Sequence, residues 1–485
     1  MLHYDMSIER RSVSALKWTA GTRLIGQSAT WVVTLILFRI LSPADYGLMA
    51  LVSVVVSVVS SVAEFGIGAS LVQARQLEAA TLQRVTGFVW ILHLAFGVLL
   101  VGAAPIAAWG FAEPRLTPLL QVAALQFAFI ALGAVPQALA LRGLDLKWLS
   151  RVELIAGIAA SLATLALALY GLGVWALVLG NLFGAALRAL VLVVGGESVW
   201  PVFRVRGIGQ HLDYGAKYSG SHLLWLVINQ SDILLGSRLM SRDALGVYSV
   251  SMHLASLPMS KVMGVVNQVA FPAVARLQDD PERLRRRLLQ ACGLLTVVSV
   301  PVLWGLAAVA PELVALALGP KWEAAARPLQ LVALVIPLRV LSGIFNTAAT
   351  GVGDAGVALS NAITIAIVWP TCFLVGAFWG ADGLAASWLV AIPTTFLLNF
   401  PRTSASVGVA FVDVLRTMRP PGLAGLAMVA SVVVTRWLIA DWALPLRTGG
   451  LVAIGAAVYL VTLTLLDRSV WLQLRQLVSS GRGDS

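Results

Sequence analysis

Residues 84–110 read RVTGFVWILHLAFGVLLVGAAPIAAWG, and no Asp, Glu, Lys or Arg follows Arg84 in this stretch. As an α-helix rising about 1.5 Å per residue, the stretch is longer than the roughly 30 Å of hydrocarbon in a bilayer. Its apolar residues are continuous rather than alternating, which excludes a membrane β-barrel. Similar runs recur along the chain, so the sequence predicts an all-α polytopic membrane protein.

The composition of the 485 residues agrees with a membrane protein. Hydrophobic residues make up 59% of the chain and charged residues 12%, about half of the roughly 25% found in soluble domains. Such a chain lacks the polar groups to cover a soluble enzyme, a disordered protein or a secreted disulfide scaffold. Cys292 and Cys372 lie inside apolar runs, so we expect no disulfide and no metal site.

We predict about fourteen transmembrane helices joined mostly by short connections. The first residues show no cleavable signal pattern, so we expect the first span to be retained. Prolines inside spans, such as Pro105 and Pro301, are candidate bending points. The predicted spans are 18–40, 47–72, 84–110, 116–141, 151–170, 173–195, 219–239, 244–273, 288–310, 327–350, 355–379, 382–400, 421–440 and 449–467.

The basic residues predict how the chain is oriented. The sequence contains 34 Lys and Arg against 23 Asp and Glu, which gives a net charge of +11. With the N-terminus in the cytoplasm, 22 of the 34 fall on the cytoplasmic side, six on the opposite side and six within spans. Cytoplasmic loops collect Lys and Arg, so we expect both termini in the cytoplasm and no nucleic acid partner.

The most strongly charged segment is QDDPERLRRR at 278–287. Asp280 precedes Pro281, a combination typical of a helix start. The arginines that follow suit anionic lipid headgroups. We therefore predict that Asp280 caps the helix of the ninth span, and that membrane lipids are partners of this segment.

An internal repeat is visible in the sequence. Shifted by 199 residues, RILSPADYG at 39–47 resembles RLMSRDALG at 238–246. Further along, the best shift is 210, which pairs Gly143 with Gly353. The change in shift is explained if the outer loop near 311–327 is longer than its counterpart in the first copy.

The repeat predicts the domain organisation. Each copy contains six spans, an even number, so the two copies are parallel repeats about an axis along the membrane normal. We predict an N-terminal six-helix lobe at 1–199, a C-terminal six-helix lobe at 200–403, and an appended helix pair with a cytoplasmic tail at 404–485. Two similar lobes with a site between them are typical of an alternating-access transporter.

Four segments, in this order and spacing, carry a resemblance to a known family. They are AEFGIGASLVQ at 63–73, GLGVWAL at 171–177, DILLG at 232–236 and FPAVARLQDDP at 271–281. Together they resemble the polysaccharide transporter (oligosaccharide flippase) family of the multidrug/oligosaccharidyl-lipid/polysaccharide (MOP) superfamily, in its colanic-acid exporter branch. The resemblance implies a V-shaped pair of lobes, with spans one, two, seven and eight lining much of a central cavity.

The resemblance also implies a function. Members of the family flip undecaprenyl-pyrophosphate-linked oligosaccharide repeat units from the cytoplasmic to the periplasmic leaflet of the bacterial inner membrane, for exopolysaccharide or lipopolysaccharide biosynthesis. They form no covalent bond, so the chain is expected to be a transporter and not an enzyme. The implied partners are the lipid-linked oligosaccharide, a polysaccharide polymerase and the export machinery.

Basic and polar residues inside spans are the candidates for a substrate cavity. A pyrophosphate cannot enter hydrocarbon without groups that replace its water, and charges inside spans are rare enough to be functional candidates. Arginine suits phosphate because its guanidinium donates two parallel hydrogen bonds. The predicted cavity residues are Arg23, Gln27, His222, Asn229, Lys261 and Arg339.

Each of these cations has a structural alternative. Arg23 could snorkel from span one to the inner headgroups, whereas Lys261, near the middle of span eight, could pair with an acid. For Arg339, central in span ten, a cavity role and a structural contact with a kinked helix both stay open. We expect Arg188 and Arg436 to be snorkelling residues.

Two acids inside spans are candidates for ion coupling. Glu64 lies in span two, and Asp232 lies in span seven close to Asn229. A buried carboxylate can bind a proton or Na⁺, so one of them could couple flipping to an ion gradient. The alternative is a fixed ion pair or hydrogen bond between helices. We expect no cofactor.

Other functions stay open at this point. An exporter of small cationic drugs would need acids in its cavity, whereas the balance within the spans is basic. A membrane polysaccharide polymerase or glycosyltransferase would need a catalytic constellation on a large outer loop. The longest outer loop, near 311–327, contains Glu312 but no paired acids and no His. A scaffold for the assembly machinery is a further possibility.

Overall fold

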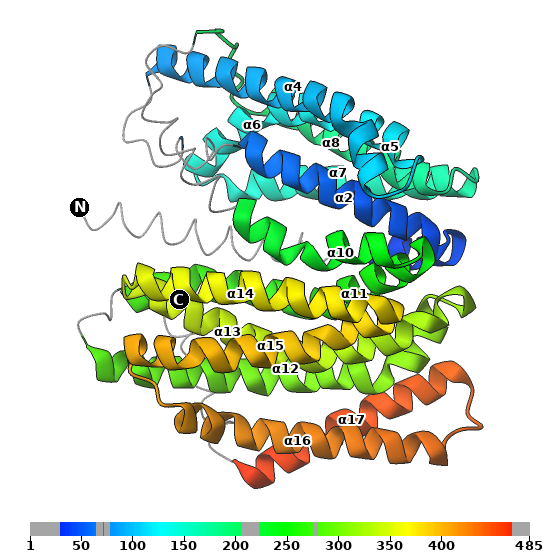
Figure 1. The fold of residues 1–485 in the computed structure, drawn as a ribbon, viewed down its shortest axis with the longest axis vertical. Helices are drawn as coiled ribbons and strands as arrows, with labels where there is room; N and C mark the ends of the chain where they lie inside the picture. Colours follow the sequence, from blue (N-terminus) through cyan, green and yellow to red (C-terminus); the bar gives the residue numbers. More distant parts are fainter. Residues whose placement is uncertain (1–29, 65–70, 72–77, 205–222, 276–279, 468–485) are drawn as a thin grey trace. The chain divides into compact units, whose positions relative to one another are not determined.

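The apolar run around residue 100 folds into one long helix, α4 (Ala79–Gly110), which passes through Pro105. The structure is a computed structural model, and its described residues form helices joined by turns, without a β-strand (Figure 1). It describes residues 30–64, 71, 78–204, 223–275 and 280–467, and the backbone alone for 260–275, 281 and 355.

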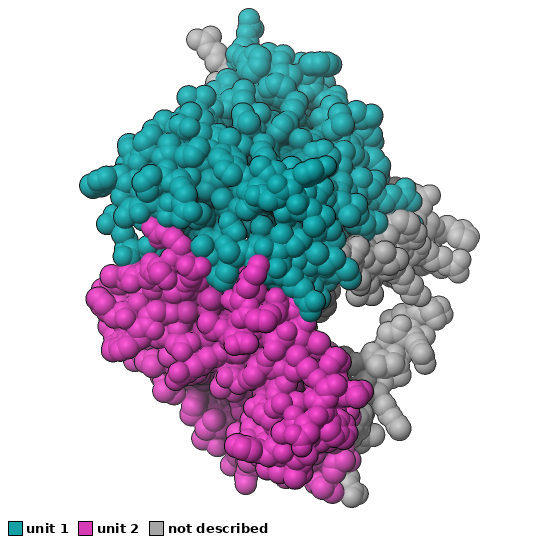
Figure 2. All heavy atoms as spheres, turned by 90° about the vertical axis from the view of Figure 1, so that its right-hand side faces the viewer, with its two compact units in different colours: residues 1–238 teal, residues 239–485 magenta. Residues whose placement is uncertain are grey.

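The chain forms two compact units, residues 1–238 and residues 239–485, coloured separately in Figure 2. The N-terminal unit contains a short helix at Thr30–Ile40, α2 (Pro43–Glu64), α4, α5 (Leu116–Ala123), α6 (Gln126–Arg142), α7 (Leu146–Leu169), α8 (Val174–Gly195) and nearly all of α10 (Ser231–Leu239). The C-terminal unit contains α11 (Arg242–Ala275), α12 (Pro281–Ala317), η1 (Pro320–Ala325), α13 (Ala326–Gly351), α14 (Ala355–Gly376), η2 (Ala377–Trp379), α15 (Gly380–Val407), α16 (Phe411–Leu438) and α17 (Leu444–Leu466).

The fourteen predicted spans are confirmed. Within the described ranges, ten helical segments are long and apolar enough to cross a membrane, and one of them, Gly356–Val407, holds the two spans α14 and α15. The other three spans are the helix at Thr30–Ile40, residues 223–229 followed by α10, and α11. The fourth predicted span consists of two helices, α5 and α6.

Helix-starting turns show the internal repeat in three dimensions. Asp145 caps α7 and Asp354 caps α14, each by accepting a hydrogen bond from the backbone N–H three residues on, at 3.1 and 3.0 Å. Gly171 lies in the turn that follows α7, and Gly380 follows η2 after α14. Both have positive φ angles, of 81° and 67°. Both pairs are 209 residues apart. At these turns the shift of 209 replaces the predicted shift of 210.

The predicted cap of the ninth span is confirmed. The Asp280 carboxylate accepts a hydrogen bond of 3.0 Å from the Arg283 backbone N–H, and Pro281 occupies the first turn of α12. The same helix continues through Pro301 to Ala317, so α12 is longer than the predicted span.

Helices α7 and α8 pack closely because α8 carries a glycine at their interface. A Cβ atom on Gly180 would lie 2.8 Å from the Thr164 Cβ and 3.0 Å from its Cα. Thr164 Oγ1 is fixed by a 2.8 Å hydrogen bond to the Ala160 carbonyl. Membrane helices associate through such small residues, because lipid provides no hydrophobic force between them.

We expect Gly180→Ala to lower the free energy of unfolding by about 1–3 kcal/mol, since the new methyl group overlaps the Oγ1 and Cβ atoms of Thr164 on the facing helix. Gly157→Ala on α7 is the matched control, because a Cβ there meets no atom within 4 Å. Thermal unfolding in detergent should show a lower melting temperature for Gly180→Ala alone. Equal melting temperatures would mean that this interface does not stabilise the unit.

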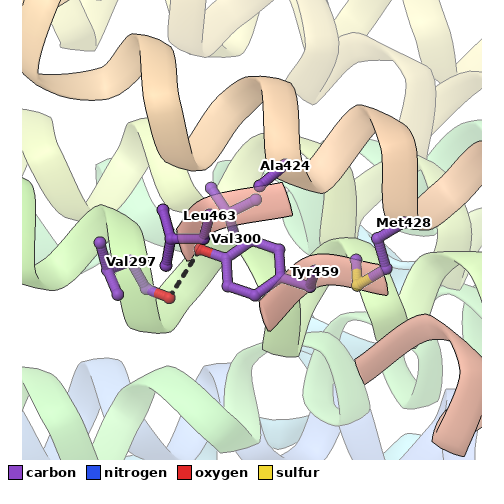
Figure 3. Packing of buried hydrophobic residues seen from close by; sticks show 6 residues of the cluster. All are labelled: Val297, Val300, Ala424, Met428, Tyr459 and Leu463. Carbon is purple, nitrogen blue, oxygen red and sulfur yellow. Dashed lines mark hydrogen bonds between the residues drawn. The ribbon is translucent and has the colours of Figure 1, made fainter. Parts of the chain in front are cut away.

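The predicted appended pair, α16 and α17, packs along α12 (Figure 1). Figure 3 shows the contact, where the Tyr459 hydroxyl donates a hydrogen bond of 2.9 Å to the Val297 carbonyl. This buried bond and the apolar cluster around it attach the pair to the C-terminal unit. The buried members of the cluster are Val297, Val300, Ala424, Met428, Tyr459 and Leu463.

Candidate functional site

A cation lies on aromatic rings within the C-terminal unit. The Arg339 guanidinium carbon, on α13, lies 4.9 Å from the ring centre of Trp388 and 5.4 Å from that of Trp369. Both rings come from neighbouring helices, α15 and α14. A guanidinium over a tryptophan face is stabilised by the ring quadrupole, so these rings hold the positive charge of Arg339 between apolar helices.

The two tryptophans form a fixed platform. Trp388 is 1% exposed, and its Nε1 donates a 2.8 Å hydrogen bond to the Tyr248 hydroxyl on α11. Trp369 Nε1 donates to Thr395 Oγ1 at 3.4 Å, and the two indole rings meet edge to face at 4.9 Å. With both indole N–H groups bonded, the rings cannot turn freely, which fixes where the Arg339 guanidinium lies.

Polar side chains continue along the same interface. Asn346 follows Arg339 by seven residues, about two helical turns, and so shares its face of α13. Asn361 Nδ2 donates to Asn346 Oδ1 at 2.8 Å and to Thr403 Oγ1 at 3.0 Å, and Asn399 Nδ2 donates to the Asn361 carbonyl at 3.5 Å. The interface of α13, α14 and α15 therefore carries a polar column on Arg339's side of the helix.

Span seven is interrupted at its predicted functional residues. Helical residues 223–229 end at Asn229, and α10 starts at Ser231. Asn229 Nδ2 donates to the Trp225 carbonyl at 2.8 Å. Asp232 is 3% exposed, and its Oδ1 accepts a hydrogen bond of 2.8 Å from the Ile233 N–H. Interrupted helices are where many transporters place their binding sites.

The remaining predicted site residues are not brought together by the described structure. Arg23, Gln27 and His222 lie outside the described residues, and of Lys261 only the backbone, within α11, is described. Glu64 is the exposed last residue of α2. Their assignment to a cavity or to ion coupling stays a prediction.

Two arginines predicted to snorkel form ion pairs instead. Arg188 on α8 bonds Glu153 on α7 at 2.8 Å. Arg436 on α16 bonds Glu312 on α12 through Nε at 2.8 Å and Nη2 at 2.9 Å, and Arg447 on α17 reaches the same carboxylate at 3.2 Å. In both cases the partner is an acid on a neighbouring helix, which the sequence did not predict.

A face of α15 carries a signal that the sequence analysis missed. Trp388, Thr395, Asn399 and Thr403 recur at spacings of seven and four residues within an otherwise apolar span. Such spacing places them on one side of a helix, and polar residues inside a span usually face protein or water.

Within the described ranges, no group of three or more His, Cys, Asp or Glu residues could hold a metal ion.

Comparison with known sequences identifies the family. Residues 36–327, more than half of the chain, match the family described as polysaccharide biosynthesis protein. The chain belongs to this family. The resemblance to a family of polysaccharide biosynthesis, predicted from the four short segments, is thereby confirmed.

Individual relatives match along most of the chain. The succinoglycan biosynthesis transport protein ExoT of Rhizobium meliloti (strain 1021) is 27% identical over 462 residues, covering 93% of this chain and 92% of ExoT. The lipopolysaccharide biosynthesis protein WzxC of Escherichia coli (strain K12) is 24% identical over 416 residues, 84% of each chain. The name of ExoT, a transport protein, agrees with a transporter and not an enzyme.

The fold is that of a solved flippase. An inward-closed structure of the lipid II flippase MurJ superposes with a TM-score of 0.73 at 13% identity, covering 92% of this chain and 98% of MurJ. At this identity the likeness establishes the fold alone. The protein is thus a multi-pass membrane protein of the MOP fold.

Proposed function

We propose that this protein flips undecaprenyl-pyrophosphate-linked oligosaccharide repeat units from the cytoplasmic to the periplasmic leaflet of the bacterial inner membrane. The observation that carries the proposal is a flippase fold in a chain of the polysaccharide biosynthesis family. The relatives named for succinoglycan and lipopolysaccharide biosynthesis support an exopolysaccharide or a lipopolysaccharide as the final product.

The mechanism is alternating access through a cationic cavity. The charged pyrophosphate needs donors that replace its water inside the membrane, and Arg339, whose cation is held on two indole faces, is one such donor. The sugar hydroxyls need neutral hydrogen-bonding groups. The other residues proposed to line the cavity are Arg23, Gln27, His222, Asn229 and Lys261.

Both termini lie in the cytoplasm in this proposal, as the distribution of Lys and Arg favours. The polymerase and export machinery take over the glycan on the periplasmic side. Glu64 or Asp232 couples flipping to a proton or Na⁺ gradient. Asp232 is the stronger candidate, because it is buried at the interruption of span seven.

The test is a flipping assay with the purified protein in liposomes. A fluorescent lipid-linked oligosaccharide should reach the opposite leaflet at least about tenfold faster than in empty liposomes, a barrier difference of about 1.4 kcal/mol. A proton or Na⁺ gradient should change this rate in the wild type, and Asp232→Asn should abolish the change. Transport of a cationic dye without flipping of the glycan lipid would contradict the proposal.

A further inference from the structure

Four helices of the N-terminal unit, α2, α5, α6 and α8, line a pocket. Its volume is about 210 Å³, room for about seven water molecules at about 30 Å³ each, or for one sugar ring. Four uncharged polar side chains reach it, and apolar side chains form the rest of its wall. The polar residues are Ser53 and Ser57 on α2, Gln126 on α6 and Asn181 on α8; the apolar ones are Met49, Val52, Val56, Ala123, Val178 and Leu182.

The polar groups lie deep in the predicted membrane. At 1.5 Å per residue, Ser53, Gln126 and Asn181 each lie about 10–16 Å from the first residue of their span. The hydrocarbon layer is about 30 Å thick, so all three lie well inside it. Within the described ranges the side chains of these three residues have no hydrogen-bond partner. The fourth polar side chain, that of Ser57, donates a hydrogen bond of 2.9 Å to the Val54 carbonyl. Lipid chains cannot form hydrogen bonds with these polar side chains, so the pocket must contain water or a polar ligand.

The pocket lies at a break in a membrane helix. Span four stops being α-helical between Ala123 and Gln126, and both of these residues line the pocket. At the break, the N–H groups of Leu125 and Phe127 donate to the carbonyls three residues earlier, both at 3.1 Å, in place of the four-residue step of an α-helix. Neither residue of the break is a proline, the usual cause of a kink. Discontinuous helices near the bilayer midplane commonly form substrate sites in transporters.

We propose that this pocket binds one neutral sugar ring of the transported glycan. The proposal rests on the proposed function and names a part of its substrate site. Amide and hydroxyl groups both donate and accept hydrogen bonds, as sugar hydroxyls do. The apolar wall fits the C–H faces of a sugar ring, and a few polar groups in an apolar wall are typical of small-molecule sites.

The lining residues suit the sugar better than the other two parts of the substrate, the pyrophosphate and the prenyl chain. None of the described residues that line the pocket is charged, so they offer the pyrophosphate no counter-charge. A prenyl chain would leave the amides of Gln126 and Asn181 without partners. A neutral, hydroxylated ring satisfies both the polar groups and the apolar wall.

A first experiment tests whether the pocket holds water and glycan. Ser53→Cys is made in a chain whose Cys292 and Cys372 are replaced by Ala. A small hydrophilic thiol reagent should label it, because the reactive thiolate requires water. The lipid-linked glycan that the wild type flips should slow the labelling at least about tenfold, equivalent to occupancy of about 90%. No labelling, or labelling that glycan does not slow, would overturn the proposal.

A second experiment compares two substrates in the flipping assay. Gln126→Leu and Asn181→Leu should each slow flipping of the glycan lipid about tenfold, a loss of about 1.4 kcal/mol. The sugar-free carrier, undecaprenyl pyrophosphate, should be flipped by these variants at the wild-type rate. Gln121→Leu is the matched control, because Gln121 is exposed on the same span and does not line the pocket.

The outcomes separate this proposal from the proposed function. A wild-type protein that flips no glycan lipid contradicts the proposed function itself. A wild type that flips it, with Leu variants that are equally fast, contradicts the sugar site alone. Equal slowing of both substrates would also reject it, since the pocket would then serve structure and not sugar recognition.

Discussion

Glu312→Gln should lower the free energy of unfolding by about 3 kcal/mol, because removing one partner of a buried ion pair leaves an uncompensated charge. The Glu312 side chain is 4% exposed, accepts two hydrogen bonds from Arg436, and forms an ion pair of 3.2 Å with Arg447. Arg436 Nη2 also donates to the Ala308 carbonyl. With a neutral amide at position 312, two largely buried guanidinium groups lose their shared counter-charge.

The measurement is thermal unfolding in detergent, followed by tryptophan fluorescence. Asp382→Asn is the control, because its pair with Arg327 is 3.4 Å long and solvent-exposed, and such pairs contribute about 0–1 kcal/mol. The triple variant Glu312→Leu, Arg436→Leu, Arg447→Leu should recover most of the loss, since a well-packed apolar replacement of buried charges is often neutral. A Glu312→Gln protein as stable as Asp382→Asn would show that the cluster does not hold α16 and α17 to α12.

This cluster illustrates what the sequence does not reveal. The apolar pattern places Glu312 in an outer loop, whereas α12 continues through it to Ala317. Its partner Arg436 is 124 residues further along the chain. Hydropathy predicts which segments cross the membrane. Which acid pairs with which base on another helix depends on how the helices pack.

The spans themselves could be predicted because the bilayer allows few alternatives. A long apolar run must satisfy its backbone polar groups internally, so it forms a helix. Breaks within a span are harder to predict. Helices α4 and α12 continue through Pro105 and Pro301, whereas span four breaks between Ala123 and Gln126 without a proline there.

The candidate site could be predicted in part. A charge in the middle of an apolar span is visible in the sequence, so the candidacy of Arg339 was predictable. Its tryptophan platform was not, because Trp369 and Trp388 look like the other aromatic residues of a membrane protein. Only the packing of α13, α14 and α15 brings their ring faces over one guanidinium.

We expect Arg339→Ala to slow flipping of the glycan lipid by about ten- to a hundredfold, because a hydrogen bond to a charged group contributes about 1.5–3 kcal/mol. Arg339→Lys should fall between this variant and the wild type. Lysine keeps the charge but lacks the planar guanidinium, which stacks on an indole ring and donates two hydrogen bonds to a phosphate. Arg416→Ala is the matched control, since Arg416 is exposed on α16, and its flipping rate should stay within about twofold of the wild type.

A purely structural role for Arg339 predicts a different pattern. Loss of the cation–π contacts with Trp369 and Trp388 would lower the melting temperature, and the flipping rate per folded molecule would be unchanged. Inorganic pyrophosphate distinguishes the two roles directly. If Arg339 binds the pyrophosphate of the substrate, Arg339→Ala should require about tenfold more inorganic pyrophosphate to inhibit flipping, a difference of about 1.4 kcal/mol. An unchanged inhibition constant would place the cation outside the substrate path, because a group that touches pyrophosphate cannot be removed without weakening its binding.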